Sequence, residues 1–253
     1  MKREPLLGAA GPPPAPAIDR RGLAGVFLFD IDGTLMQSGG AGGVAFRRAF
    51  HIWSGIDPSY VAIPMAGRTD PEILRLTLAA LGVPYPAPPE RRRLVRLYLR
   101  ILAEELQVPG RAALCPGIAE LLRALANSSG AVGLVTGNIE PGARAKLAAA
   151  GLAARFDFGA YGSDHEDRDC LVPIALRRLH RRRGLAPRPE RVWVIGDTLR
   201  DVQCARAAGV RMLAVGTGFE DQDALAASGP DLYFPDLSDT AAVLSELVGS
   251  PRG

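Results

Sequence analysis

The chain has 253 residues, enough for one large domain or a core with a smaller insert, and 47% of them are hydrophobic, which excludes wholesale disorder. The 30 basic residues nearly balance the 27 acidic ones, so the net charge of +3 does not by itself indicate nucleic-acid binding. No apolar run approaches the ~18–20 residues of a membrane span, and three widely spaced cysteines argue against a zinc site or disulfide framework and fit a reducing, cytoplasmic compartment.

The first 22 residues are rich in proline, alanine and glycine and predict a disordered tail. The apolar stretch at 6–10 is too short for the apolar region of a signal peptide, and prolines follow it. The tail is therefore excluded from the predicted fold.

Short apolar runs without polar alternation follow the tail, a pattern typical of parallel strands covered on both faces. These runs occupy residues 25–30, 131–136, 192–197 and 212–217, with shorter candidates at 156–162 and 231–237. Helical patterns separate them at 117–126, 141–152, 171–183 and 199–209. The alternation of strand and helix predicts an α/β fold with an open, parallel, Rossmann-like sheet.

One long segment, about 44–107, breaks this alternation because its pattern is helical throughout. Helical patterns cover 42–53, 70–82 and 89–106, and Asp70-Pro71 has the form of a cap followed by a first-turn proline. We therefore predict a helical cap domain at 38–114, inserted into a catalytic core formed by 23–37 and 115–248. The glycine-rich stretch 38–43 would serve as a hinge for its opening and closing.

Acidic residues follow two of the predicted buried strands. Asp30 and Asp32 are two residues apart at a strand end, so they leave it on the same face. Asp197 follows another strand, and Asp201 lies one helical turn further on the same side. Ligands bind at the carboxyl ends of the strands in open α/β sheets, and a set of hard oxygen ligands without nearby histidine or cysteine favours Mg²⁺.

These acids suit phosphoryl transfer. Next to Mg²⁺, an aspartate can attack phosphorus and form an aspartyl-phosphate, and a second acid can protonate the leaving oxygen and then activate water. Thr136, Gly137 and Asn138 lie at a third strand end, where their donors can bind the transferred phosphoryl group.

Three motifs occur in order along the chain: DIDGT at 30–34, TGN at 136–138 and GDTLRD at 196–201. Together with the inserted helices, they resemble motifs one, two and four of the haloacid dehalogenase-like hydrolases, closest to the phosphoglycolate-phosphatase-like branch with a helical cap. The likeness covers roughly residues 24–240. It implies a Mg²⁺-dependent phosphatase for a small phosphorylated metabolite, such as a phosphoglycolate-like compound or a sugar phosphate.

The resemblance also implies roles for the acids. Asp30 would be the nucleophile and a Mg²⁺ ligand, and Asp32 the general acid and base, with its backbone carbonyl also on Mg²⁺. Asp197 would bind Mg²⁺, while Asp201 would orient waters or a basic residue around the metal. The acid at position 32 favours phosphate-ester hydrolysis over carbon–halogen cleavage, because dehalogenases of this fold lack it.

The resemblance implies further roles outside the acids. Thr136 and Asn138 would hold the phosphoryl group, and Arg68 and Thr69 would reach the substrate from the insert. The usual lysine of the third motif is absent from 162–178, and Arg168 stands in its expected place. Lys146 is the alternative, but an exposed helix face accounts for it better.

Two other functions stay open: a sugar-phosphate mutase on the same scaffold and a non-catalytic module that binds a phosphorylated ligand. The arginine runs at 91–93 and 181–183 predict solvated helix faces, with little aromatic interleaving for nucleic acid. The expected partner is a small phosphorylated substrate, with no nucleic acid or membrane, in a monomer or homodimer.

Overall fold

The structure is a computed structural model that describes residues 25–128 and 130–249, so the predicted tail lies outside the described residues. Its centre is a six-stranded sheet in the order β5-β4-β1-β6-β7-β8, and every neighbouring pair is parallel. The strands are β1 (Val26–Phe29), β4 (Ala131–Thr136), β5 (Gly159–Tyr161), β6 (Val192–Gly196), β7 (Arg211–Val215) and β8 (Leu232–Phe234). The predicted open parallel α/β sheet is confirmed.

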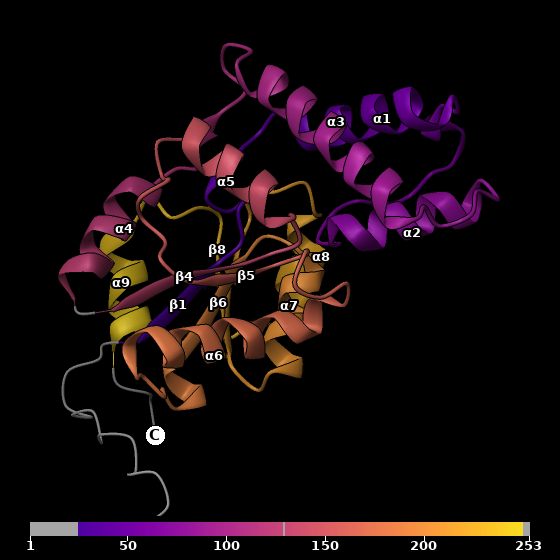
Figure 1. Cartoon of the computed structure of the whole chain (residues 1–253). Coiled ribbons are helices and arrows are strands. Elements are labelled where there is room, and N and C mark those ends of the chain that lie inside the picture. The colour runs from indigo at the N-terminus through magenta and orange to yellow at the C-terminus, as the bar shows by residue number, and fades with distance from the viewer. Residues whose placement is uncertain (1–24, 129, 250–253) are drawn as a thin grey trace, which may run out of the picture.

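Helices cover both faces of this sheet, as the continuous apolar strands require (Figure 1). Phe27 and Phe29 of β1 contribute to an apolar cluster on one face, and Val26 and Leu28 to a second cluster on the other. The first cluster includes α4 (Ile118–Asn127), α5 (Glu140–Ala149) and α9 (Thr240–Val248). The second includes α6 (Leu171–Arg183), α7 (Leu199–Ala207) and α8 (Gln222–Ala227). Short 3₁₀ helices occur at η2 (Arg168–Cys170) and η3 (Pro189–Arg191).

The helices between β2 (Met36–Gln37) and β3 (Ala113–Leu114) gather beyond one end of the sheet (Figure 1). They are α1 (Ala41–Ser54), η1 (Pro58–Tyr60), α2 (Asp70–Ala80) and α3 (Pro88–Leu106). The chain reaches them through β2 and returns through β3, which pair antiparallel. This small ribbon was not predicted, because two residues per strand are too few to show a sequence period.

The cap of α2 differs from the prediction. The N-cap residue is Thr69, whose Oγ1 accepts a hydrogen bond from the backbone amide of Glu72 at 3.2 Å, and Asp70 is the first helical residue. Threonine is a good N-cap, and the proline after Asp70 supports the first turn. Within the described residues, none of the helices combines the length and the apolar character needed to cross a membrane.

Candidate active site

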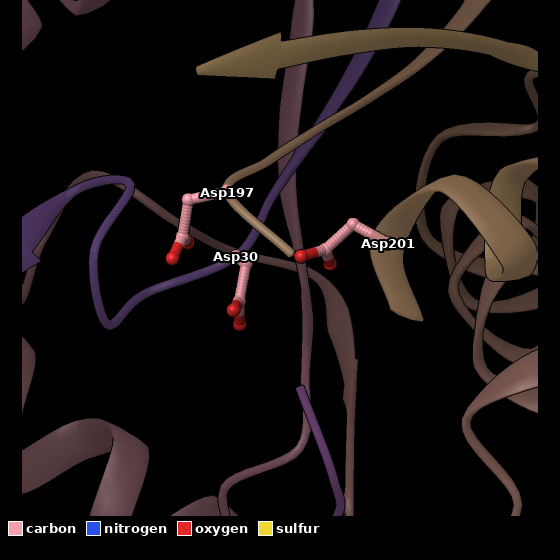
Figure 2. Close-up of side chains that lie close together, drawn as sticks. All are labelled: Asp30, Asp197 and Asp201. Carbon is pink, nitrogen blue, oxygen red and sulfur yellow. The ribbon is translucent and has the colours of Figure 1, made fainter. Parts of the chain in front are cut away.

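Three acidic residues from separate parts of the chain meet at the carboxyl end of the sheet. Asp30 follows β1, Asp197 follows β6, and Asp201 lies in the first turn of α7. All three are buried, and one carboxylate oxygen from each lies within 4.8 Å of the other two. Figure 2 shows the carboxyl groups of Asp30, Asp197 and Asp201 approaching one another. The first and fourth motifs, which are far apart in the sequence, therefore place their acids at one site.

Asp201 is held by both its own helix and a buried arginine. Its carboxylate accepts hydrogen bonds from the Thr198 hydroxyl at 2.6 Å and the Thr198 amide at 3.1 Å, completing a capping box. Arg168 also donates to Asp201 and lies 3.4 Å from Asp30 Oδ2. Burial raises the pKa of Asp201 to about 6, although Arg168 acts in the opposite direction.

The charge of Asp197 is less well compensated than that of Asp201, because no basic side chain forms an ion pair with Asp197 in the described residues. Its Oδ1 accepts a hydrogen bond from the Thr34 hydroxyl at 2.7 Å. Burial, then the charges of Asp201 and Asp30, raise the pKa of Asp197 well above its usual value. A Cβ atom on either Gly33 or Gly218 would overlap the Asp197 carboxyl group, so both loops close tightly around it.

The donors and charges of this cluster fit a divalent cation. Three carboxylates are matched by one guanidinium, that of Arg168, and Asp30 Oδ1 is buried with no hydrogen-bond partner in the described part of the chain. A buried carboxylate oxygen without a partner is costly, and a hard cation would satisfy it. Asp30, Asp197 and Asp201 are therefore the residues that could hold a metal.

Asp32 occupies a neighbouring position but is not part of this cluster. Its carboxylate accepts hydrogen bonds from Ser38 Oγ at 2.7 Å, Asn138 Nδ2 at 2.9 Å and Lys146 Nζ at 2.5 Å. Burial acts to raise the pKa of Asp32, but Lys146 and the hydrogen-bond donors outweigh it and lower that pKa. Its expected contribution to a metal through the backbone carbonyl stays a prediction.

Lys146 is not on an exposed helix face, so that interpretation was wrong. It is buried on α5, and its Nζ also donates to Asn138 Oδ1 at 2.6 Å. The helix pattern misled us because the residues around Lys146 are mostly small alanines that give no clear apolar stripe. A composition signal did exist: Lys146 and Lys2 are the two lysines of a chain with 30 basic residues.

Ser38, unlike Lys146, was not considered as a site residue in the sequence. It lies just after β2, in the glycine-rich stretch we treated as a hinge, and its hydroxyl bonds to Asp32. Two of the contacts of Asp32 therefore come from residues that the motifs did not indicate.

The TGN turn joins the sheet to the insert. Thr136 and Asn138 are buried, and Asn138 Nδ2 donates to Thr136 Oγ1 at 2.9 Å. The Gly137 carbonyl accepts a hydrogen bond from the Asp70 amide at 2.8 Å, and a Cβ on Gly137 would overlap the Arg68 carbonyl oxygen. Glycine at 137 thus permits the close approach of two backbones.

The structure places Arg68 and Thr69 at this same contact. Arg68, in the loop before α2, pairs with Glu72 in the first turn of that helix, whereas the Gly67 carbonyl accepts a hydrogen bond from Arg168 at 3.0 Å. Thr69 is fully buried and its hydroxyl donates to the Glu166 carbonyl at 2.6 Å. Neither side chain contacts the three acids in these interactions, and their substrate contacts stay predictions.

Comparison with known proteins links this geometry to a family. Residues 27–206 match the family model described as haloacid dehalogenase-like hydrolase. A phosphoglycolate phosphatase of Synechococcus elongatus is 30% identical over 230 residues, covering 87% of this chain and 97% of the relative. Another, of Salmonella typhimurium, is 28% identical over 248 residues, covering 88% and 92%.

Solved structures show the same fold. A hydrolase from Pseudomonas syringae superposes with a TM-score of 0.67 at 21% identity, covering 88% of this chain and 99% of that one. CbbY from Rhodobacter sphaeroides, solved with phosphate, gives a TM-score of 0.64 at 23% identity, with coverage of 85% and 95%.

Proposed function

The chain belongs to the haloacid dehalogenase-like hydrolases, in their phosphoglycolate-phosphatase-like branch, and from this we propose a Mg²⁺-dependent phosphatase that uses an aspartyl-phosphate intermediate. The proposed substrate is a small phosphorylated metabolite, phosphoglycolate-like or a sugar phosphate. As a member of a hydrolase family the protein is an enzyme, and its curated relatives are phosphatases.

The observation that carries the proposal is the state of Asp30. One of its oxygens is 3.4 Å from Arg168, while the other is buried without a partner in the described residues. A carboxylate oxygen left free among three buried acids suits a nucleophile beside a cation. A structural aspartate would instead have both oxygens bonded.

We assign the metal to Asp30, Asp197 and Asp201, with the backbone carbonyl of Asp32 as a further ligand. When bound, Mg²⁺ would neutralise the carboxylates and the substrate phosphate, so that the two anions can approach each other. Arg168 would add a second positive charge beside Asp30 Oδ2.

In the first step, a carboxylate oxygen of Asp30 bonds to phosphorus as the ester oxygen departs with its electron pair. Asp32, whose low pKa in the free protein would be raised by the negative charge of the bound phosphate ester, gives its proton to that oxygen, producing the free alcohol and a phosphorylated Asp30. In the second step, Asp32 takes a proton from a water that attacks phosphorus. Phosphate leaves, Asp30 regains its carboxylate, and Asp32 regains its proton.

The remaining predicted residues support this chemistry. Thr136, Gly137 and Asn138 would contact the phosphoryl oxygens from the end of β4. Residues 38–114 would form a cap over the acids, with Arg68 and Thr69 on its nearest loop. The hydrogen bonds from Asp70 to Gly137 and from Arg168 to Gly67 support a closed arrangement.

The test is phosphate release from a panel of small phosphate esters with and without Mg²⁺. We expect Mg²⁺-dependent release by the wild type and a loss of at least about 10³-fold for Asp30→Asn. Wild-type turnover by Asp30→Asn would refute the assigned nucleophile. Isomerised sugar phosphate with little free phosphate would point to the mutase, and no turnover of any ester to a binding module.

A further inference from the structure

We propose that Lys146 is a positioning residue for Asp32, which it holds in the orientation for proton transfer to the leaving group. The inference rests on the proposed phosphatase function and adds a residue that none of the family motifs in the sequence includes. It depends on the contacts of Lys146, on its burial, and on the space that Gly42 leaves for it.

The ammonium group of Lys146 joins the two polar side chains nearest to it. It donates to Asp32 Oδ2 at 2.5 Å and to Asn138 Oδ1 at 2.6 Å. Asn138 in turn donates to the same Asp32 oxygen at 2.9 Å, so the three groups form a closed triangle. Ser38 binds the other oxygen, and together these donors fix the plane of the carboxylate.

Burial makes a purely structural pairing a poor explanation. The Lys146 side chain is 4% exposed, whereas that of Asp32 is 36% exposed and accessible to water. Lys146 offsets the desolvation of Asp32, but Asp32 keeps access to solvent through its exposed part, while burying the lysine almost completely is costly. A methionine or leucine would fill the same space on α5 at lower cost. The presence of a lysine at this position is explained better by its role in fixing the orientation of the Asp32 carboxylate.

Other charges around Lys146 favour its position. Asp70, the first residue of α2, interacts with both Lys146 and Asp32, and Tyr98 of α3 lies near the same acids. The ammonium thus sits in a negative field formed by the core and the insert. Lys146 therefore lies between Asp32 and the inserted helices α2 and α3, which under the proposed function would recognise the substrate.

Gly42 of α1 provides the room for the ammonium group. A Cβ atom added at Gly42 would lie 3.2 Å from Lys146 Nζ, closer than ordinary van der Waals contact. At the next residue, Gly43, an added Cβ would meet Arg47 at 3.5 Å and Met65 at 3.6 Å, which is ordinary contact. Alanine favours a helix over glycine at either position, so the two substitutions differ mainly in their effect on Lys146.

The first test compares two esters that differ in how much their leaving groups need a proton: phenyl phosphate and p-nitrophenyl phosphate. We expect Lys146→Met to lower kcat/KM for phenyl phosphate by about 10- to 100-fold and for p-nitrophenyl phosphate by less than about threefold. kcat/KM is used because it covers the step in which Asp32 donates its proton. Equal losses on both esters would overturn the proposal.

A double-mutant cycle with Asp32→Asn tests whether Lys146 acts through Asp32. We expect Lys146→Met to cause no further loss on phenyl phosphate in the Asp32→Asn background. Additive losses would show an independent role and contradict the inference. Mg²⁺-dependent turnover by the wild type, abolished in Asp30→Asn, shows in the same assays that the phosphatase function itself holds.

The glycine pair provides a test that does not depend on folding of the lysine variant. We expect Gly42→Ala to lower the ratio of phenyl to p-nitrophenyl phosphate turnover, and Gly43→Ala to leave that ratio at the wild-type value. Both variants should melt at or above the wild-type temperature. An unchanged ratio in Gly42→Ala, at wild-type stability, would refute the inferred role.

Discussion

Arg168 forms a buried ion pair with Asp201 and lies close to Asp30, and both partners are themselves buried. Burial opposes the charged guanidinium, but Asp201 and Asp30 outweigh this and raise the pKa of Arg168 further above its usual value. Such a pair is sensitive to the loss of one partner, because the other is left as an uncompensated buried charge.

We therefore expect Arg168→Met to lower the free energy of unfolding by about 3–5 kcal/mol in the absence of metal. Adding Asp201→Asn should recover much of this loss, because it removes the stranded carboxylate, but should not recover turnover. Chemical denaturation and phosphate release measure the two effects separately. If the double variant were no more stable than Arg168→Met, the buried pair would not be the source of the loss.

Asp70 gives a prediction about pH. Burial raises its pKa to about 6 from 3.8, although Lys146 and the Ile139 amide act in the opposite direction. The folded state therefore binds this proton more tightly than the unfolded state does. The contribution of Asp70 to stability falls as pH rises from about 4 to about 6, and the resulting cost is at most about 3 kcal/mol above that range.

Asp70→Asn should consequently raise the melting temperature at pH 7.5, because the asparagine carries no charge and its oxygen can still accept from the Ile139 amide. The gain should shrink toward zero between pH 6 and pH 4. Paired melting curves of the two proteins cancel the titration of other acids. A gain that did not change with pH would show that ionisation of Asp70 is not its cause.

At this scale the sequence was most informative about acids and least about bases. Asp30 and Asp197 were expected to meet because each follows a buried strand, and parallel strands end at one edge. Asp201 was expected there because it lies one helical turn beyond Asp197. Lys146 lies inside a helix, where its direction depends on the helix rotation and on Gly42, over 100 residues earlier. No local sequence pattern indicates the contact between Lys146 and Gly42.

The contact between α2 and the turn after β4 is the clearest link between two elements of the site. The Asp70 amide donates to the Gly137 carbonyl, and no side chain fits at Gly137 without displacing the Arg68 carbonyl. This contact places the loop before α2 beside the buried acids. Its loss should separate the helices from the sheet without unfolding either.

We expect Gly137→Ala to reduce kcat/KM by about 10- to 100-fold while melting within a few degrees of the wild type. Gly142→Ala is a matched control on α5, because its added Cβ would lie 3.4 Å from Tyr98, an ordinary contact. Limited proteolysis of residues 61–69 should accelerate in Gly137→Ala alone. Full activity of that variant would show that the close backbone contact is dispensable.

Strands and long helices could be predicted because each has a period or an unbroken apolar run. Four strands and three helices fall within two residues of the predicted bounds: β1, β4, β6, β7, α4, α6 and α7. The shorter strands β5 and β8 and the helix α5 each differ from the prediction by three residues at one end. By contrast, α8 has six residues, and α9 lies near the end of the chain with little charge to define a face. Neither gave a pattern strong enough to predict.

For the molecule as a whole, the clustered acids imply that metal and stability are linked. In the metal-free protein, Asp30, Asp197 and Asp201 repel one another in a buried space, and a ligand that binds the folded state stabilises it. We expect Mg²⁺ at about 100 times its dissociation constant to raise the free energy of unfolding by about 2.7 kcal/mol, and EDTA to reverse this.

Asp197→Asn should show the opposite pattern: higher melting temperature than the wild type in EDTA, and little further rise with Mg²⁺. The substitution removes one buried charge and also one metal ligand. Differential scanning calorimetry with Mg²⁺ and EDTA distinguishes these effects. A normal Mg²⁺-induced rise in Asp197→Asn would place the cation elsewhere in the molecule.

The strand order could not be predicted from the sequence, because no residue pattern indicates which strands are neighbours in the sheet. The family resemblance supplied an expected fold, and the sheet order followed from the structure. The division at 38–114 came from the change of period, and the structure places α1–α3 between the two strands of the β2–β3 ribbon.

That ribbon has a consequence for how the protein can change. Met36 pairs with Leu114 and Gln37 with Ala113, so the chain departs from the core and returns at adjacent points. The distance between β2 and β3 is therefore the same whatever the number of residues in the insert between them. An insert of another length could therefore be accommodated at this point, because its two ends stay adjacent and the positions of Asp30 and Asp197 on the sheet do not change.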